Sequence, residues 1–173
     1  MPGGETQLTL PSPYSLDLTV RSHGWYQCPP FRWTDDGGLI RGERLGDDDY
    51  LIHARQRGDK LHLSVEGPAA SGEAGTQMIS RAVRMLRLDE DLSGFQGMAA
   101  DKAKIAGAVG RGWGRILRGS SLWEDVIKAL MGTNVAWRQA VRMIDNLCRL
   151  GPSSTLADDL PLVPTPAEVL AHD

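Results

Sequence analysis

Apolar and polar residues alternate in short runs along the first third of the chain, a pattern typical of half-buried strands. The turn at Arg57–Lys60 separates two such runs and predicts a hairpin. Two prolines at positions 29 and 30 remove backbone donors, so the run that contains them is predicted at a sheet edge. The predicted antiparallel strands are Leu16–Val20, Cys28–Trp33, Leu39–Leu45, Tyr50–Ala54 and Leu61–Val65.

Beyond residue 75 the apolar period lengthens to about 3.6 residues, which predicts helices. One is expected over Thr76–Leu88 and a shorter one over Ala100–Val109. Strands followed by helices indicate an α+β fold, with an N-terminal antiparallel sheet and a helical region after it. We expect a flexible lead-in over residues 1–13, a sheet-plus-helix domain over 14–95 and the first helices of a helical domain over 96–173.

The stretch Ser120–Leu150 predicts two amphipathic helices that meet at a polar corner, Gly132-Thr133-Asn134. Ser121 and Glu124 have the spacing of a capping box at the start of the first helix. Thr133 and Asn134 are good N-cap residues for the second. A small polar corner between buried helices can present side chains to a partner. The apolar positions that are expected to be buried are Leu122, Val126, Ile127, Leu130 and Met131, then Trp137, Ala140, Val141, Ile144, Leu147 and Cys148.

A further helix start occurs at Pro164–Glu168, with Thr165 as the cap and Pro166 in the first turn. The sequence ends soon afterwards, and isolated helices so short are marginal in water. We therefore expect the chain to be the N-terminal portion of a longer protein.

The 173 residues are 41% hydrophobic and carry a formal net charge of −3, as in an ordinary globular protein. Residues 101–150 nevertheless hold nine basic and four acidic side chains. This basic stretch is compatible with a local phosphate-binding surface, and a solvated face is the alternative interpretation.

Other features exclude several classes of function. The two cysteines, Cys28 and Cys148, are not in a metal-ligand spacing, so we predict no metal site and no cofactor. The first residues do not resemble a signal peptide, and no apolar run approaches about 18 residues. We expect no membrane partner and a cytoplasmic, nucleoid-associated location.

The order of these features resembles the helix-hairpin-helix DNA glycosylase superfamily, in its 3-methyladenine and 8-oxoguanine branch. The likeness covers residues 14–173 and is carried by Leu16–Val20, Pro30–Trp33, Leu88–Leu92 and, most strongly, Leu122–Asn134. It implies a sheet domain that resembles the TATA-binding protein, ahead of an all-helical domain. It also implies base-excision repair. Such proteins bind double-stranded DNA, flip out an alkylated or oxidised base and cleave its N-glycosidic bond.

The resemblance assigns roles to two groups of residues. A polar side chain from the corner Gly132, Thr133 and Asn134 is expected to fill the gap or contact the orphaned base, with Gln139 near the opposite base. Independently of the resemblance, Arg138 is a candidate DNA contact because of its charge, and a surface ion pair is the alternative. Phe31, Arg32 and Trp33 match a family stretch near the base pocket, where an aromatic ring could stack on the flipped base. An N-cap role for Asn134 and strand packing for Trp33 are the alternatives.

The catalytic parts of the family are not found in this sequence. They comprise a hairpin of the Leu-Pro-Gly-Val-Gly type and a later Asp, and Gly110–Gly114 does not match because it lacks the Pro and precedes the corner. We therefore name no catalytic residue and expect the chain alone to be inactive. A non-catalytic DNA- or partner-binding module and an inactive fragment remain alternatives.

Overall fold

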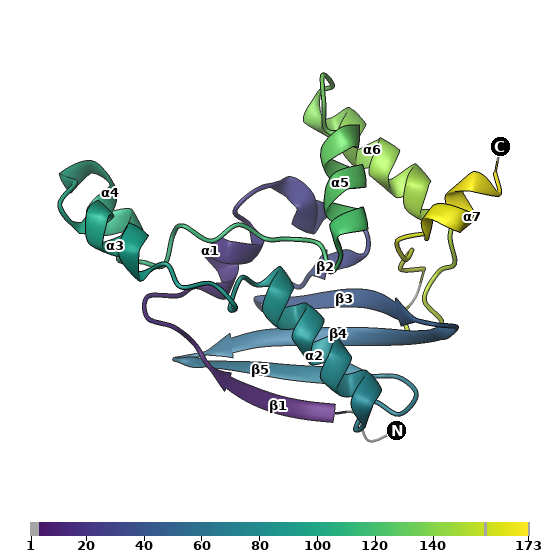
Figure 1. The fold of residues 1–173 in the computed structure, drawn as a ribbon, viewed down its shortest axis with the longest axis horizontal. Helices are drawn as coiled ribbons and strands as arrows, with labels where there is room; N and C mark the ends of the chain where they lie inside the picture. Colours follow the sequence, from purple (N-terminus) through teal and green to yellow (C-terminus); the bar gives the residue numbers. More distant parts are fainter. Residues whose placement is uncertain (1–3, 158, 173) are drawn as a thin grey trace.

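A computed structural model describes residues 4–157 and 159–172 of the chain. Its centre is a five-stranded sheet in the order β1-β5-β4-β3-β2, with every neighbouring pair antiparallel (Figure 1). The predicted hairpin joins β4 and β5, and the strand after the two prolines lies at an edge of the sheet. The α+β class is therefore confirmed. The strands are β1 (Gly4–Thr9), β2 (Phe31–Trp33), β3 (Gly38–Leu45), β4 (Asp48–Arg57) and β5 (Lys60–Glu66).

Two expectations for the first part of the chain were wrong. Leu16–Val20 forms the short helix α1, in which Ser15 caps the first turn by accepting from the backbone N–H of Leu18. The fifth strand is β1, which lies within the expected lead-in and pairs with β5. A run of five residues that is apolar at its first and last positions fits one helical turn as well as a strand. The spacing of its apolar residues therefore does not distinguish a helix from a strand.

The helices follow the strands, as predicted, and α2 packs across one face of the sheet (Figure 1). The expected helix over Ala100–Val109 is divided between α3 and α4, which project together at one end, while α5 and α6 rise at the other. None of the described helices is long and apolar enough to cross a bilayer. The helices are η1 (Gly24–Gln27, a 3-10 turn), α2 (Glu73–Met85), α3 (Ser93–Ala100), α4 (Ala103–Val109), α5 (Leu122–Met131), α6 (Trp137–Cys148) and α7 (Pro166–Leu170).

The other face of the sheet is covered only in part. The segment after α6 returns to it and buries Leu160 and Leu162 beside Gly42, where a Cβ atom would lie 2.5 Å from the Leu162 side chain. Arg44 of β3 then holds α7 through two hydrogen bonds to the Glu168 carboxylate, at 2.7 and 2.6 Å. The remainder of this face is open to solvent.

Helix α5 buries charged residues and exposes its apolar stripe, which is the reverse of the prediction. Leu122 is 71% exposed and Leu130 62%, whereas Glu124 and Lys128 are each 1% exposed. Ser121 caps the helix as predicted, but the Glu124 carboxylate turns inward and accepts from the backbone N–H of Ser120 at 2.9 Å instead of closing a capping box. Tertiary contacts therefore override the hydrophobic pattern in this helix.

Helix α6 follows the predicted pattern more closely. Ala140, Ile144, Leu147 and Cys148 are buried, but Trp137 at its start is 41% exposed. Trp113, which lies within Gly110–Gly114, is exposed as well. The two tryptophans lie on the helical side of the molecule, away from the core of the sheet.

Candidate nucleic-acid interface

The corner between α5 and α6 is longer and more open than the sequence indicated. Helix α5 ends at Met131 with Gly132 as its C-cap, and α6 begins only at Trp137. Gly132, Thr133 and Asn134 are all exposed. Asn134 has a φ of 56°, in the left-handed region that asparagine tolerates better than most residues. An amide residue is thus placed at the tip of the corner by the backbone conformation.

The side chains of the corner do not cap α6. The N-cap position is occupied by Ala136, which makes no side-chain hydrogen bond, so the N-cap role predicted for Thr133 and Asn134 was wrong. Thr133 instead donates its hydroxyl to the Leu130 carbonyl at 2.7 Å. The Asn134 amide has no hydrogen-bond partner within the described residues. Its donor and acceptor groups are therefore free to meet a ligand.

Two cations stand on α6 next to the corner. Arg138 and Arg142 are exposed and form no ion pair with any residue that the structure describes, and Gln139 between them is exposed as well. Arg149, at the other end of the helix, pairs with Asp145 at 2.8 Å. The unpaired cations therefore lie at the N-terminal half of α6, where the helix dipole adds partial positive charge.

A hollow of about 570 Å³ lies beside the corner. Its walls include Trp25, Ile116 and Trp137, together with the edge of His23, whose ring meets that of Trp25 at 83° with centroids 4.9 Å apart. Trp137 closes over Gly24, where a Cβ atom would lie 2.0 Å from the indole. Sequence reasoning missed this hollow, although Trp137 directly follows the corner and had been assigned to the core.

His23 is held in one tautomer at the edge of the hollow. Its Nδ1 accepts from the backbone N–H of Trp25 at 3.2 Å, so Nε2 carries the proton and donates to the Leu117 carbonyl at 2.8 Å. Burial lowers the pKa of His23 below its ordinary value. The imidazole is therefore neutral at pH 7 and serves to fix the loop that positions Trp25.

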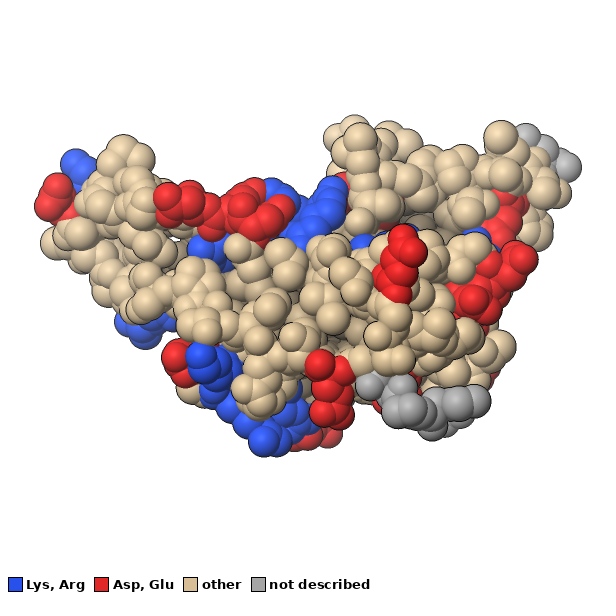
Figure 2. Space-filling view, turned by 60° about the horizontal axis from the view of Figure 1, so that its bottom comes forward, with Lys and Arg blue, Asp and Glu red and all other residues tan. Residues whose placement is uncertain are grey.

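Ion pairs neutralise the charges on the surface between the α3–α4 pair and the α5–α6 pair of helices. In Figure 2 the surface dips between these two pairs, and basic and acidic side chains meet along the dip. Arg84 pairs with Asp125 at 2.8 Å, and Arg118 pairs with Asp89 at 3.4 Å and with Glu90. The dip is thus not a positive field, and phosphate contacts are better supplied by the unpaired arginines of α6.

The three residues expected at the base pocket are separated by the alternation of the strand. Phe31 and Trp33 face the core, whereas Arg32 lies opposite Ile40 and faces the other way. Phe31 is buried, with the Arg41 guanidinium 4.4 Å and the Lys128 ammonium 4.9 Å from its ring centroid. This arrangement does not bring the three side chains to one pocket.

A buried ion cluster joins α5 to the sheet and so positions the corner. Arg41 of β3 donates to both oxygens of Glu124, at 3.0 and 2.7 Å, and to Glu43 at 2.5 Å. Lys128 donates to Glu124 at 2.6 Å. Burial alone would raise the pKa of Glu124, but Arg41 and Lys128 together hold that pKa well below its usual range. The Glu124 carboxylate therefore remains charged in the interior.

Within residues 4–157 and 159–172, no three His, Cys, Asp or Glu side chains gather as metal ligands. The candidate site is therefore the exposed corner, the two unpaired arginines of α6 and the aromatic hollow beside them.

The sheet, the helix pair and its exposed corner form a DNA glycosylase-like fold. The solved structure of a 3-methyladenine DNA-glycosylase from Archaeoglobus fulgidus matches this chain with a TM-score of 0.73 and 16% sequence identity. The match covers 96% of this chain and 58% of that one, so the chain spans little more than half the length of the similar structure. No protein-family model matches the sequence, and neither does any curated protein.

Proposed function

We propose that this chain is the sheet-bearing part of a DNA base-excision glycosylase of the helix-hairpin-helix kind, and that its corner contacts duplex DNA at a damaged base. The observation that carries the proposal is Asn134, an exposed amide without a partner in the described structure, at the tip of a helix pair. The likeness of the fold to a 3-methyladenine DNA-glycosylase supports the same assignment.

The role of the corner follows from the chemistry of base excision. A base inside the duplex is unreachable at its glycosidic carbon, so it must leave the stack, and a damaged base costs less to extrude. Asn134 is short and carries both a donor and an acceptor, so it suits the gap and the edge of the orphaned base. Arg138 and Arg142 would contact phosphates on either side, which positions the corner without reading sequence.

We assign DNA binding to this chain and no catalytic residue. The corner itself offers an amide, a hydroxyl and a glycine, none of which is a general base or a nucleophile at neutral pH. The purified chain is expected to release no base from duplexes that carry alkylated or oxidised bases. Base release by this chain alone, measured by chromatography of the free base, would place catalysis on residues described here.

The salt dependence of duplex binding tests the interface. Each phosphate contact contributes about −0.9 to the slope of log K against log salt concentration. Replacing Arg138 and Arg142 with Gln should therefore make the slope shallower by roughly 2 units. Arg149→Gln is the matched control, because this arginine is already paired with Asp145 and should leave the slope unchanged. A double variant with the slope of the unmodified chain would remove α6 from the interface.

A further inference from the structure

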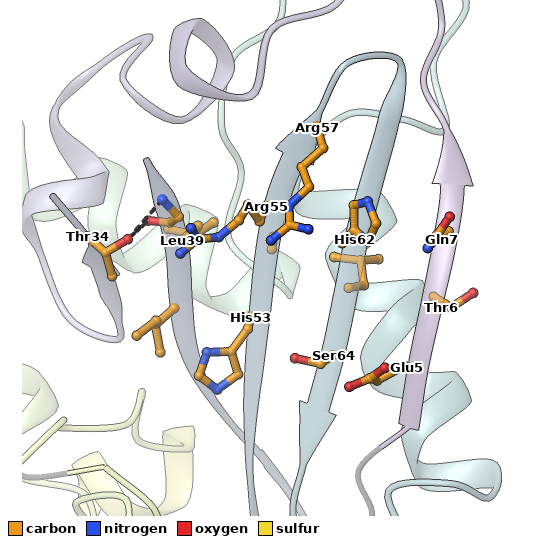
Figure 3. A pocket seen from close by; sticks show the side chains of 14 residues that line it. Glu5, Thr6, Gln7, Thr34, Leu39, His53, Arg55, Arg57, His62 and Ser64 are labelled. Carbon is orange, nitrogen blue, oxygen red and sulfur yellow. Dashed lines mark hydrogen bonds between the residues drawn. The ribbon is translucent and has the colours of Figure 1, made fainter. Parts of the chain in front are cut away.

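A second candidate site lies on the open face of the sheet, away from the corner. A groove of about 670 Å³ crosses β1, β5, β4 and β3 there and reaches the turn after β2 (Figure 3). Ligand pockets in proteins commonly measure about 300–1,000 Å³. Arg41 and Glu43, which meet α5 and α2, point to the opposite face of the same sheet. The groove is therefore independent of the proposed DNA interface.

Basic side chains line one end of this groove. The strand register places Arg55 opposite His62 and His62 opposite Gln7, and it places Arg57 opposite Lys60. In Figure 3 the Arg57 side chain folds back along β4, so that its guanidinium lies on the side of His62, whereas the Arg55 side chain extends the other way, towards Leu39. Like charges directly opposite one another on paired strands are destabilising. The arrangement becomes favourable when an anion lies among them.

Neighbouring acids offset only part of this charge. Asp36 pairs with Arg55 at the β2 side, and Asp59 lies 3.9 Å from Lys60. Arg57 and His62 have no hydrogen-bond or ion-pair partner anywhere in residues 4–157 and 159–172.

The acids at the other end of the groove do not reach these two side chains. Glu5 of β1 is the register partner of Ser64 on β5. The Nε2 atom of His53 lies 3.0 Å from the Oε1 atom of Glu66, without hydrogen-bond geometry. One end of the groove therefore holds an uncompensated guanidinium and a free imidazole.

We propose that this groove binds a small phosphorylated molecule, with its phosphate group held between Arg57 and His62. The planar fork of an arginine matches phosphate oxygens in two-point contacts, and Gln7 and the imidazole supply further donors. The segment through Leu160 covers the neighbouring part of this face over Gly42, which limits the length of a ligand along the strands. The volume and this cover favour a compound of nucleotide size over a long polymer.

Binding of inorganic phosphate and of a mononucleotide to the purified chain tests the proposal. Both ligands should raise the melting temperature in a concentration-dependent manner, beyond sodium chloride at equal ionic strength, because a ligand that binds only the folded state stabilises it. Isothermal titration then gives the affinities. Arg57→Gln and His62→Gln should each weaken mononucleotide binding, the arginine variant by about ten-fold or more, since charge-assisted hydrogen bonds are lost.

The controls separate this groove from the DNA interface. Arg149→Gln changes the same residue type outside the groove, and Asn134→Gly alters only the corner; both should bind the mononucleotide like the unmodified chain. Arg57→Gln is expected to fold, because Arg57 is exposed at the end of β4, and a denaturation curve verifies this.

Two results would overturn the proposal. One is the absence of any phosphate-specific effect, or an Arg57→Gln variant that binds the mononucleotide as tightly as the unmodified chain. The other is a single-stranded oligonucleotide that binds more tightly than the mononucleotide and is lost with Arg57→Gln, which would assign the groove to a nucleic-acid backbone.

Discussion

Replacing Glu124 with Gln should destabilise the fold far more than an ordinary charge substitution. The Glu124 carboxylate is 1% exposed and accepts from Arg41, from Lys128 and from the backbone N–H of Ser120. A glutamine of the same size keeps one acceptor but turns its NH₂ group towards donors that it cannot satisfy. Among the described residues Lys128 then has no acidic partner, and Arg41 keeps only Glu43, which also pairs with Arg81.

The expected magnitude follows from that imbalance. Removing one partner of a buried pair leaves an uncompensated charge and costs about 3–5 kcal/mol. For a chain of this size each kcal/mol lowers the melting temperature by roughly 2–4 °C, so the variant should melt roughly 6–20 °C lower. Glu124→Gln combined with Lys128→Met removes the unpaired ammonium group and leaves Arg41 on Glu43, so it should recover part of the loss, since apolar replacements of buried ion pairs are often neutral.

Urea denaturation followed by circular dichroism measures these free energies. Asp145→Asn is the matched control, because it removes an acid from the more exposed pair with Arg149 and should cost less than about 1 kcal/mol. A loss below about 1 kcal/mol for Glu124→Gln, or a double variant no more stable than the single one, would refute the reasoning that charge, not apolar burial, holds α5 on the sheet.

Two further predictions concern pH and the exposed stripe. The hydrogen bonds from Arg44 hold the pKa of Glu168 at about 2, below its ordinary 4.5, so this pair stabilises the fold above about pH 4.5 and the contribution is lost as the pH falls towards 2. Glu168→Gln should therefore flatten the acid-unfolding curve in that window, and an unchanged curve would contradict the pairing. Leu130→Lys should change the free energy of unfolding by no more than about 0.5 kcal/mol, whereas Ile144→Ala should lower it by about 2–5 kcal/mol, both measured by urea denaturation. Equal losses in the two variants would mean that the apolar stripe of α5 is buried.

The sequence was most informative where structure depends on neighbours along the chain. The hairpin of β4 and β5 and the buried face of α6 follow from local alternation and period, and both were predicted correctly except for Trp137 at the start of α6. Leu16–Val20 could not be assigned because five residues satisfy both periods. The orientation of α5 depends on Arg41, which is 83 residues from Glu124 in sequence. A local sequence pattern gives no information about a contact between residues so far apart in the chain.

The corner between α5 and α6 was predictable in its position along the chain and not in its detail. The polar residues at 132–134 marked a corner between two helices, and the structure exposes that corner at the surface. Its left-handed backbone at Asn134 and the missing side-chain cap depend on how the two helices are held. The hollow beside it brings together Trp25, Ile116 and Trp137 from three separate segments. Such a cluster forms only after the chain has folded.

The preference for a duplex with an abasic site over an intact duplex tests the role of the corner most directly. Asn134→Gly is the appropriate variant, because glycine keeps the φ of 56° and removes only the amide side chain. The unmodified chain should bind the abasic duplex more tightly, and the glycine variant should lose this preference while it still binds the intact duplex equally well. The same ratio of the two affinities in both proteins would contradict the insertion of Asn134 into damaged DNA.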